Sequence, residues 1–324
     1  MQKTEELKAL YDEKLKGKLQ EQEAIRKKIF YRTLISAVSF IGSIFAGIFL
    51  ADRVDHPAVN IIAFIGIPSI ALILFFTTFP AYKRYVNFYK TSIVSEIVRF
   101  IHPDLRYQPN GKIREYIYRD SDLFRTRYDK YEGEDLVQGV IDKTDFECSE
   151  LHTQYKTTTS NGKGQSKTEW HTIFRGLFFH ADFNKEFNGR TYVAPDTAEK
   201  LFGKWGQKLQ KIGGKADLVK LENSEFEKEF VVHSTDQIEA RYILTPTMME
   251  AILNLKKEYN CRLNVSFIGS RVYCAFELNE DLFEPNLFRS GVNFKDIVKM
   301  YHYFNLSISI IEELNLNNRI WTKN

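Results

Sequence analysis

The sequence has few cysteines, and their spacing matches no metal-binding motif. Cys148, Cys261 and Cys274 are separated by intervals that zinc and iron–sulfur sites do not use. An odd and sparse set of thiols is typical of a protein in a reducing cytosol. We therefore expect neither a metal site nor a bound cofactor.

A large excess of charge of either sign is also missing. The chain carries 45 Lys and Arg residues against 42 Asp and Glu residues, a formal net charge of +3. A dedicated nucleic-acid binder normally has a marked basic excess, so we expect no nucleic-acid partner. The basic residues gather beside two apolar segments instead, which favours contact with anionic lipid headgroups.

These two segments contain no ionisable side chain. Residues 33–51 and 58–79 are rich in Ile, Leu and Phe, and at about 1.5 Å per helical residue each is long enough to cross a bilayer. Two adjacent uncharged runs of this length are rare in soluble cores, and the mixed-charge residues 1–32 argue against a cleaved signal peptide. The sequence predicts a transmembrane helical hairpin over residues 33–81, with a kink at Pro68.

Lys and Arg residues near the segment ends predict the orientation. Basic residues flank the outer ends of both segments, whereas the connection at residues 52–57 has only Arg53, beside Asp52 and Asp55. By the positive-inside rule, both termini of a two-span membrane protein are expected in the cytoplasm. The residues predicted to contact lipid headgroups are Arg26, Lys27, Lys28, Arg32, Lys83 and Arg84.

The predicted spans lack the intramembrane charges that ion and proton pathways use, which argues against a transporter. Ser39, Ser43 and Gly47 recur every four residues in the first span. Small residues on one helix face let two backbones approach closely. We expect this stripe to seat the second helix of the hairpin, with self-association as the alternative.

The rest of the chain is predicted to form helical extensions and one α+β domain. Apolar periodicity predicts a cytoplasmic helix over residues 1–32 and a second helical extension over 82–106, ended by His102 and Pro103. Residues 107–324 are expected to form a cytoplasmic domain of antiparallel strands with packed helices, subdivided near 213–216. Tyr82, Tyr85 and Tyr89 are expected either to anchor at the membrane interface or simply to pack.

Alternating patterns and turn residues locate the elements of this domain. Strands are expected at residues 136–141, 146–157, 169–183, 216–221 and 225–232, and helices at 196–213, 245–259 and 293–311. The clearest element is a hairpin turning at Gly269 and Ser270, in which Val265 opposes Cys274. Residues 106–111 read as a turn-rich link. The heptad stripe of the last helix predicts packing on the sheet, with a dimer seam as the alternative.

No catalytic motif is intact. The segment 158–168 contains Gly162, Gly164 and Lys167 but lacks the first glycine and the following helix of a phosphate-binding loop. His180 and Asp182 fall on one face of a predicted strand, but no nucleophile or metal cluster accompanies them. With Glu134 and Asp135, they are the weak candidates for a catalytic group.

Three runs resemble a known family: residues 133–139 (GEDLVQG), 174–185 (FRGLFFHADFNK) and 226–246 (FEKEFVVHSTDQIEARYILTP). They are similar to uncharacterised bacterial membrane proteins grouped as domain of unknown function 3137 (DUF3137). The resemblance implies two N-terminal spans, a cytoplasmic domain and a bacterial inner-membrane location. It implies no activity, substrate or catalytic residue.

The leading functional hypothesis is a membrane-tethered binding or scaffold module. A large predicted inner domain, a short outer loop and uncharged spans favour an anchor that presents a domain to a cytoplasmic or membrane protein partner. An unrecognised enzyme and a sensor of the lipid surface are the alternatives. Assembly into a homo-oligomer is a further expectation.

Overall fold

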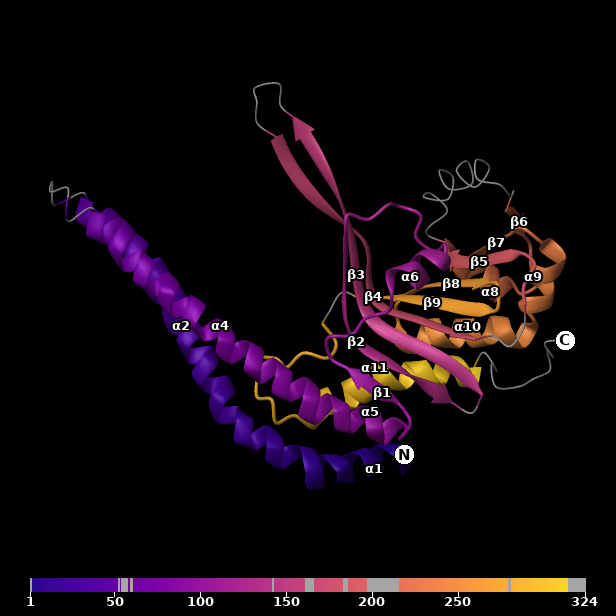
Figure 1. Cartoon of the computed structure of the whole chain (residues 1–324), viewed down its shortest axis with the longest axis horizontal. Coiled ribbons are helices and arrows are strands. Elements are labelled where there is room, and N and C mark those ends of the chain that lie inside the picture. The colour runs from indigo at the N-terminus through magenta and orange to yellow at the C-terminus, as the bar shows by residue number, and fades with distance from the viewer. Residues whose placement is uncertain are drawn as a thin grey trace. The chain divides into compact units, whose positions relative to one another are not determined.

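The structure, a computed structural model, describes residues 2–51, 53, 58, 61–141, 143–160, 166–182, 186–196, 216–278 and 281–313 (Figure 1). It contains two compact units. One comprises Met1–Phe100 with Leu282–Tyr301, and the other comprises Ile101–Asp281 with His302–Asn324. The chain combines long apolar N-terminal helices with an antiparallel sheet and packed helices, which confirms the predicted α+β class.

The first unit is built on two long helical runs. The first run consists of α1 (Gln2–Leu10), a π-helical turn η1 (Tyr11–Leu15) and α2 (Lys16–Ala51). The second consists of η2 (Ile62–Gly66), α4 (Ile67–Tyr89), η3 (Lys90–Val94) and α5 (Ser95–Ile101). Both predicted helical extensions are therefore continuous with the apolar segments. Pro68 is the second residue of α4 and follows directly on the π-helical turn η2, so it lies inside a continuous helical run.

Small residues line the contact between α2 and the second run. Ser43 and Gly47 are buried as predicted, but Ser39 is exposed and Ser36 takes its place. Each step of four residues turns about 40° around a helix, so three such positions drift off one face. A Cβ added at Gly47 would lie 3.1 Å from the Phe64 ring. The stripe therefore seats the second helix of the same hairpin.

Residues 282–293 return to this unit from far along the sequence. The Tyr82 hydroxyl donates to Glu284 at 3.1 Å, and the Gly291 N–H donates to Glu23 at 3.2 Å. The predicted domain 107–324 is therefore wrong over residues 282–301, which belong with the helical unit. Tyr85 and Tyr89 are buried, so packing explains them better than an interfacial anchor.

The second unit contains a nine-stranded sheet among the described residues. Its order is β1-β2-β3-β4-β9-β8-β5-β7-β6, with every neighbouring pair antiparallel. The strands are β1 (Arg106–Gln108), β2 (Lys130–Ile141), β3 (Thr144–Ser160), β4 (Ser166–Asp182), β5 (Arg190–Pro195), β6 (Asp217–Val219), β7 (Phe230–Ser234), β8 (Arg262–Ile268) and β9 (Arg271–Glu277). Strands before and after residues 213–216 share this sheet, so the predicted subdivision there is wrong.

Two local predictions are also wrong. The turn-rich link at 106–111 begins with strand β1, which pairs with β2. The predicted strand at 225–232 begins as a short helix, α8 (Ser224–Glu229), because the Asn223 side chain accepts hydrogen bonds from the N–H groups of Glu225 and Phe226. Only its end continues into β7.

Helices cover both faces of the sheet. Helix α6 (Glu115–Asp120) places Tyr118 against Phe174 and Phe178, with ring centroids 6.4 and 5.3 Å apart. Helix α10 (Pro246–Tyr259) places Tyr259 on Phe276, which points to the opposite face because its neighbour Ala275 pairs with Phe178. The remaining helices are α9 (Gln237–Ile243) and α11 (Phe294–Glu313).

The predicted hairpins are confirmed. Val265 opposes Cys274 across β8 and β9, and Cys274 is fully buried. The β3–β4 hairpin is longer than predicted, and its far half extends beyond the other strands of the sheet (Figure 1). The glycine-bearing loop at 161–165, most of the connection at 52–57 and the predicted helix at 196–213 lie outside the described residues, Arg53 and Asp196 excepted.

Candidate functional site

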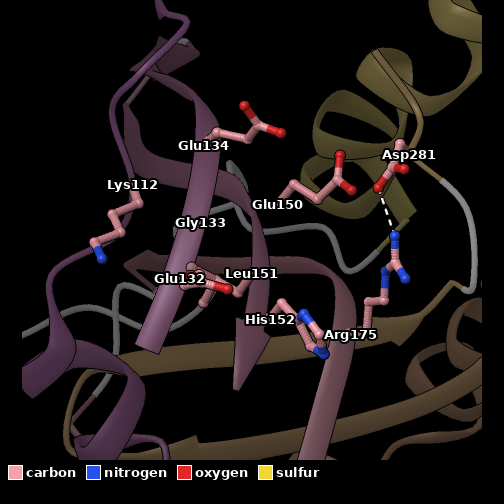
Figure 2. Close-up of a pocket in the computed structure, with 9 residues that line it drawn as sticks. All are labelled: Lys112, Glu132, Gly133, Glu134, Glu150, Leu151, His152, Arg175 and Asp281. Carbon is pink, nitrogen blue, oxygen red and sulfur yellow. Dashed lines mark hydrogen bonds and ion pairs between the residues drawn. The ribbon is translucent and has the colours of Figure 1, made fainter. Parts of the chain in front are cut away.

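A pocket of about 430 Å³ opens on the sheet unit beside β2, β3 and β4 (Figure 2). Charged side chains dominate its wall. Its lining residues are Lys112, Glu132, Gly133, Glu134, Glu150, Leu151, His152, Arg175 and Asp281. Acidic and basic groups both face the pocket, so it suits a polar ligand that carries charge of either or both signs.

Three residues that line the pocket form one row across neighbouring strands. His152 on β3 lies opposite Glu132 on β2 and opposite Arg175 on β4. Arg175 reaches Asp281 with an ion pair of 2.5 Å, drawn as a dashed line in Figure 2. Partial burial, with a smaller contribution from Arg175, lowers the pKa of His152 below its usual value of 6.5. His152 is therefore mostly neutral at pH 7, with Nε2 lying 3.1 Å from the Thr172 hydroxyl.

The adjoining row brings two carboxylates together. Glu134 and Glu150 are directly opposed across β2 and β3, an arrangement that is unfavourable without compensating contacts. Gly133 lies between Glu132 and Glu134, and a Cβ there would come within 2.5 Å of Leu151. Only glycine fits this position without moving the neighbouring strand, and Gly133 itself lines the pocket.

Asp135 points to a different environment. It adopts a left-handed backbone conformation (φ 58°) at the register shift between β2 and β3, as bulges often require. Its buried carboxylate accepts a hydrogen bond from the Tyr107 hydroxyl. Burial and this carboxylate raise the pKa of Tyr107. Of the predicted pair, Glu134 lines the pocket and Asp135 stabilises the bulge behind it.

His180 and Asp182 lie away from the pocket. His180 is five residues beyond Arg175 on β4, roughly 17 Å at the usual rise of a strand. It is buried, with Nε2 at 3.3 Å from Glu147 and Nδ1 at 3.0 Å from Arg271. Arg271 can only donate, so Nδ1 accepts and Nε2 donates. Both ring nitrogens are thus engaged, which fits a structural histidine. Asp182 lies opposite Arg271 at the end of the strand.

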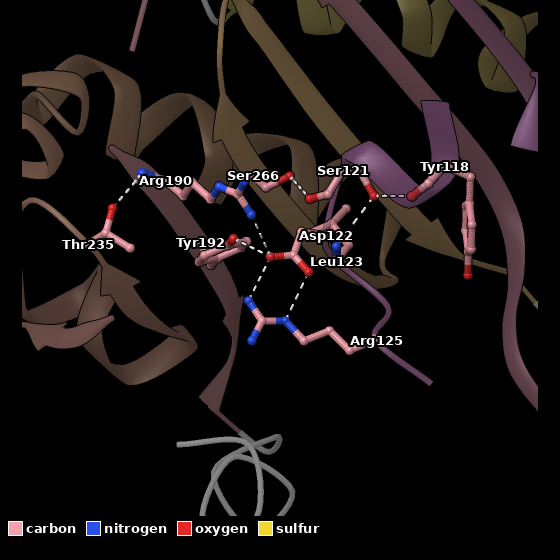
Figure 3. Close-up of polar contacts among 9 residues, drawn as sticks. All are labelled: Tyr118, Ser121, Asp122, Leu123, Arg125, Arg190, Tyr192, Thr235 and Ser266. Carbon is pink, nitrogen blue, oxygen red and sulfur yellow. Dashed lines mark hydrogen bonds and ion pairs between the residues drawn. The ribbon is translucent and has the colours of Figure 1, made fainter. Parts of the chain in front are cut away.

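A second polar cluster ties α6 to the distant strand β5 (Figure 3). Arg125 donates two hydrogen bonds to the Asp122 carboxylate, at 3.0 and 2.7 Å. The Tyr192 hydroxyl donates to the same group at 2.6 Å, and Arg190 lies 3.5 Å from it. The carboxylate is therefore saturated with donors, and the cluster is a structural clamp.

Arg26 does not fit its predicted role as a lipid contact. Its side chain is only 7% exposed, pairs with Glu23 at 2.8 Å and donates to the backbone carbonyl of Leu287. The hydrogen bond from Arg26 lowers the pKa of Glu23. Arg26 thus fastens the returning loop to α2. The other predicted contacts are exposed: Lys27, Lys28, Arg32, Lys83 and Arg84.

Most residues of the pocket were not predicted. Lys112, Arg175 and Asp281 come from segments separate from the β3 residues Glu150 and His152, and only the fold brings them together. Polar residues on alternate positions of the strand at 146–157 were the one available signal. Among the described residues, no group of three His, Cys, Asp or Glu side chains is placed to hold a metal ion.

Comparison with known proteins identifies the second half of the chain. Residues 172–316 match the family described as protein of unknown function (DUF3137). The similarity to DUF3137 covers somewhat less than half of the chain. The matched region contains two of the three runs that carried the resemblance, and it contributes Arg175 and Asp281 to the pocket. The other lining residues precede the matched region.

The remaining comparisons add little. No curated protein matches the chain. One solved structure, the mycobacterial trehalose monomycolate transport factor A (TtfA), aligns with 8% identity and a TM-score of 0.29, covering 66% of this chain and 93% of that chain. We draw no conclusion about this chain from a similarity of this size.

Proposed function

We propose that this protein is an integral inner-membrane protein whose sheet unit is a binding module presented to the cytoplasm. The observation that carries the proposal is the apolar surface of α2 and α4. Two helical stretches, Lys3–Leu50 and Phe64–Ile101, are long and apolar enough to cross a membrane. Their large side chains point outward, as with Phe45 at 69% and Phe76 at 66% exposure. Water would meet a continuous apolar surface here, whereas lipid solvates it.

The distribution of basic residues supports the cytoplasmic orientation. Lys27, Lys28 and Arg32 are exposed where the first apolar run begins, and Lys83 and Arg84 are exposed where the second ends. Exposed cations at these positions meet the anionic headgroups of the cytoplasmic leaflet. Contact between these five side chains and lipid is part of the proposal. A lipid-sensing role rests on the same residues and predicts binding that weakens with added salt.

The pocket supports a binding role for the sheet unit. It gathers charged groups of both signs around the neutral His152 and the Arg175–Asp281 ion pair. We propose that it receives a charged segment of a protein partner. Arg175 and Asp281 are the residues that such a segment would meet, because both are partly exposed and each can exchange its present partner for a ligand group.

The experiment compares partners recovered with the intact protein from gently solubilised membranes. We expect the wild-type chain to enrich a reproducible protein partner and Arg175→Glu to lose it. The control Lys156→Glu reverses an exposed charge on the β3–β4 hairpin, outside the pocket, and should retain the partner. The double variant Arg175→Asp with Asp281→Arg keeps an ion pair but reverses the pocket, so it should fold and still lose the partner. Equal recovery with all four chains would contradict a role for the pocket.

A further inference from the structure

The loop at residues 282–293 carries the most exposed large apolar side chain recorded in the structure. Phe288 is 84% exposed, although the neighbouring Leu282 and Phe283 are buried. An isolated exposed apolar residue is ordinary on a protein surface. The position of Phe288 in the helical unit makes it informative.

The loop is held firmly against both helical runs. Arg26 of α2 donates to the Leu287 carbonyl, directly before Phe288, and Tyr82 of α4 donates to Glu284 at 3.1 Å. The Asn286 side chain accepts from the Phe288 N–H at 2.8 Å, which forms a tight turn under the ring. A Cβ at Gly291 would lie 3.1 Å from the Tyr85 hydroxyl, so the loop follows the helices closely. These contacts fix the turn that holds the Phe288 side chain in its exposed position.

The ring lies at the level where the first apolar run begins. It packs edge-on against Phe30, with centroids 6.0 Å apart, and Phe30 contacts the half-exposed Tyr31 at 5.4 Å. The uncharged run starts three residues after Phe30, at Thr33. The exposed cations Lys28 and Arg32 flank the same turns of α2. Aromatic rings beside basic residues at the end of an apolar helix are typical of the membrane–water interface.

We infer that Phe288 inserts into the interfacial layer of the cytoplasmic leaflet, as an anchor separate in sequence from the two spans. With Phe30 and Tyr31, it forms an aromatic group that sets the depth of the hairpin. The Arg26 contact fastens residues 282–293 to α2, and the ring ties them to the lipid surface. The inference rests on the proposed membrane location. It takes lipid, and not a second protein, to be what covers the Phe288 ring.

The test measures the depth of single fluorophores in the full chain. Cysteine variants are made in a Cys261→Ser background, because Cys148 and Cys274 are buried. Phe288→Cys, Phe45→Cys and Glu13→Cys are labelled with an NBD maleimide and reconstituted at one chain per vesicle, in phosphatidylcholine with phosphatidylglycerol. Spin-labelled lipids carry the quencher either near the headgroup or deep in the acyl chain. Glu13 is exposed on η1, roughly 25 Å along the helix before Phe30.

We expect the label at position 288 to be quenched at least twofold more by the shallow quencher than by the deep one. The label at position 45 should show the reverse order, and the label at position 13 should not be quenched. If position 45 is quenched while position 288 behaves like position 13, the anchor is wrong and the spans stand. A blue-shifted but unquenched label at position 288 would show that protein covers it, which also overturns the inference. An unquenched label at position 45 would remove the membrane location itself and the anchor with it.

Discussion

At the residue scale, two glycines allow the central strands to approach as closely as they do. Gly176 on β4 has a φ of 146°, and a Cβ there would lie 2.0 Å from the Phe276 carbonyl oxygen of β9. Gly133 on β2 is equally confined by Leu151 and the Glu150 backbone. Neither position accepts a side chain without a shift of backbone atoms, and both lie beside the charged pocket.

Gly176→Ala should destabilise the protein by about 3 kcal/mol, because the new methyl group meets backbone and the φ value is strained for an L residue. Thermal unfolding of the detergent-solubilised chain measures the change. Gly17→Ala is the matched control, since nothing lies within 4 Å of a Cβ at that helical position. It should be neutral or stabilise by up to about 1 kcal/mol. Equal melting temperatures for the two variants would contradict the packing described.

Two histidines predict how stability depends on pH. Burial lowers the pKa of His152 and His233 below the usual 6.5. The unfolded chain then binds these protons at higher pH than the folded chain does, so stability is complete above pH 6.5 and falls as pH is lowered through the folded-state pKa values. The free energy of unfolding should therefore decrease from pH 7 to pH 5.

The variants His152→Gln and His233→Gln isolate this contribution. Each should show a smaller loss of stability between pH 7 and pH 5 than the wild type, measured by urea unfolding. The interval from about pH 9 to about pH 8 is the control, because both histidines are almost fully neutral there in the folded and the unfolded chain. Wild-type slopes in both variants would show that other groups cause the pH dependence.

Sequence patterns do not reveal which charged residues turn inward. Arg26 belongs to a basic cluster beside an apolar run, and nothing in that cluster distinguishes it from Lys27 or Lys28. Its burial depends on Leu287, which is 261 residues away. Glu150, His152 and Arg175 meet for a similar reason, since only the register of three strands aligns them. The buried face of Cys274, in contrast, follows from strand alternation alone.

At the element scale, the hairpin of α2 and α4 has small buried residues on both helices. Ser36, Ser43 and Gly47 are buried on α2, and Ala71 and Thr78 are buried on α4. The buried hydroxyls of Ser43 and Thr78 donate to carbonyls of their own helices, at 2.7 and 2.6 Å. The contact is therefore made by close packing of small side chains, as in membrane helix pairs generally.

Gly47→Leu should weaken this pair, because even the first carbon of the side chain lies 3.1 Å from Phe64. We expect a loss of about 1 to 3 kcal/mol from overpacking, seen as a lower melting temperature in detergent. Gly42→Leu is a matched control on the same helix, since nothing lies within 4 Å of its Cβ. If Gly42→Leu were the more damaging change, the exposed face would be a contact with another chain.

Elements with strong periodicity were predictable, and short capped helices were not. The hairpin of β8 and β9 and the helix beginning at Thr245 follow from local patterns, and the Thr245 hydroxyl accepts from the Met248 N–H at 3.2 Å as a cap does. The strand predicted at residues 225–232 was wrong at its start, because the Asn223 cap outweighs the strand propensity of the residues that follow it. Such a cap is visible in the sequence, but its outcome depends on Phe226 reaching the core.

At the scale of the whole molecule, the chain leaves the helical unit at Phe100 and returns to it at Leu282. The two long apolar helices and the sheet were predictable from composition and alternation. The return of the chain to the helical unit was not predictable, because residues 282–293 have no regular pattern and are held by single contacts such as Tyr82 with Glu284. The sequence thus anticipated both parts of the chain but divided them at the wrong place.

The central claim is that α2 and α4 cross a membrane and hold the sheet unit on the cytoplasmic side. The most direct test is sided labelling of Arg53→Cys and Ile238→Cys with a membrane-impermeant maleimide, in the Cys261→Ser background. Arg53 is exposed between the spans, and Ile238 is 82% exposed on the sheet unit. In spheroplasts only Arg53→Cys should react, and in inverted vesicles only Ile238→Cys should react. Reaction of both cysteines from the same side would contradict the claim.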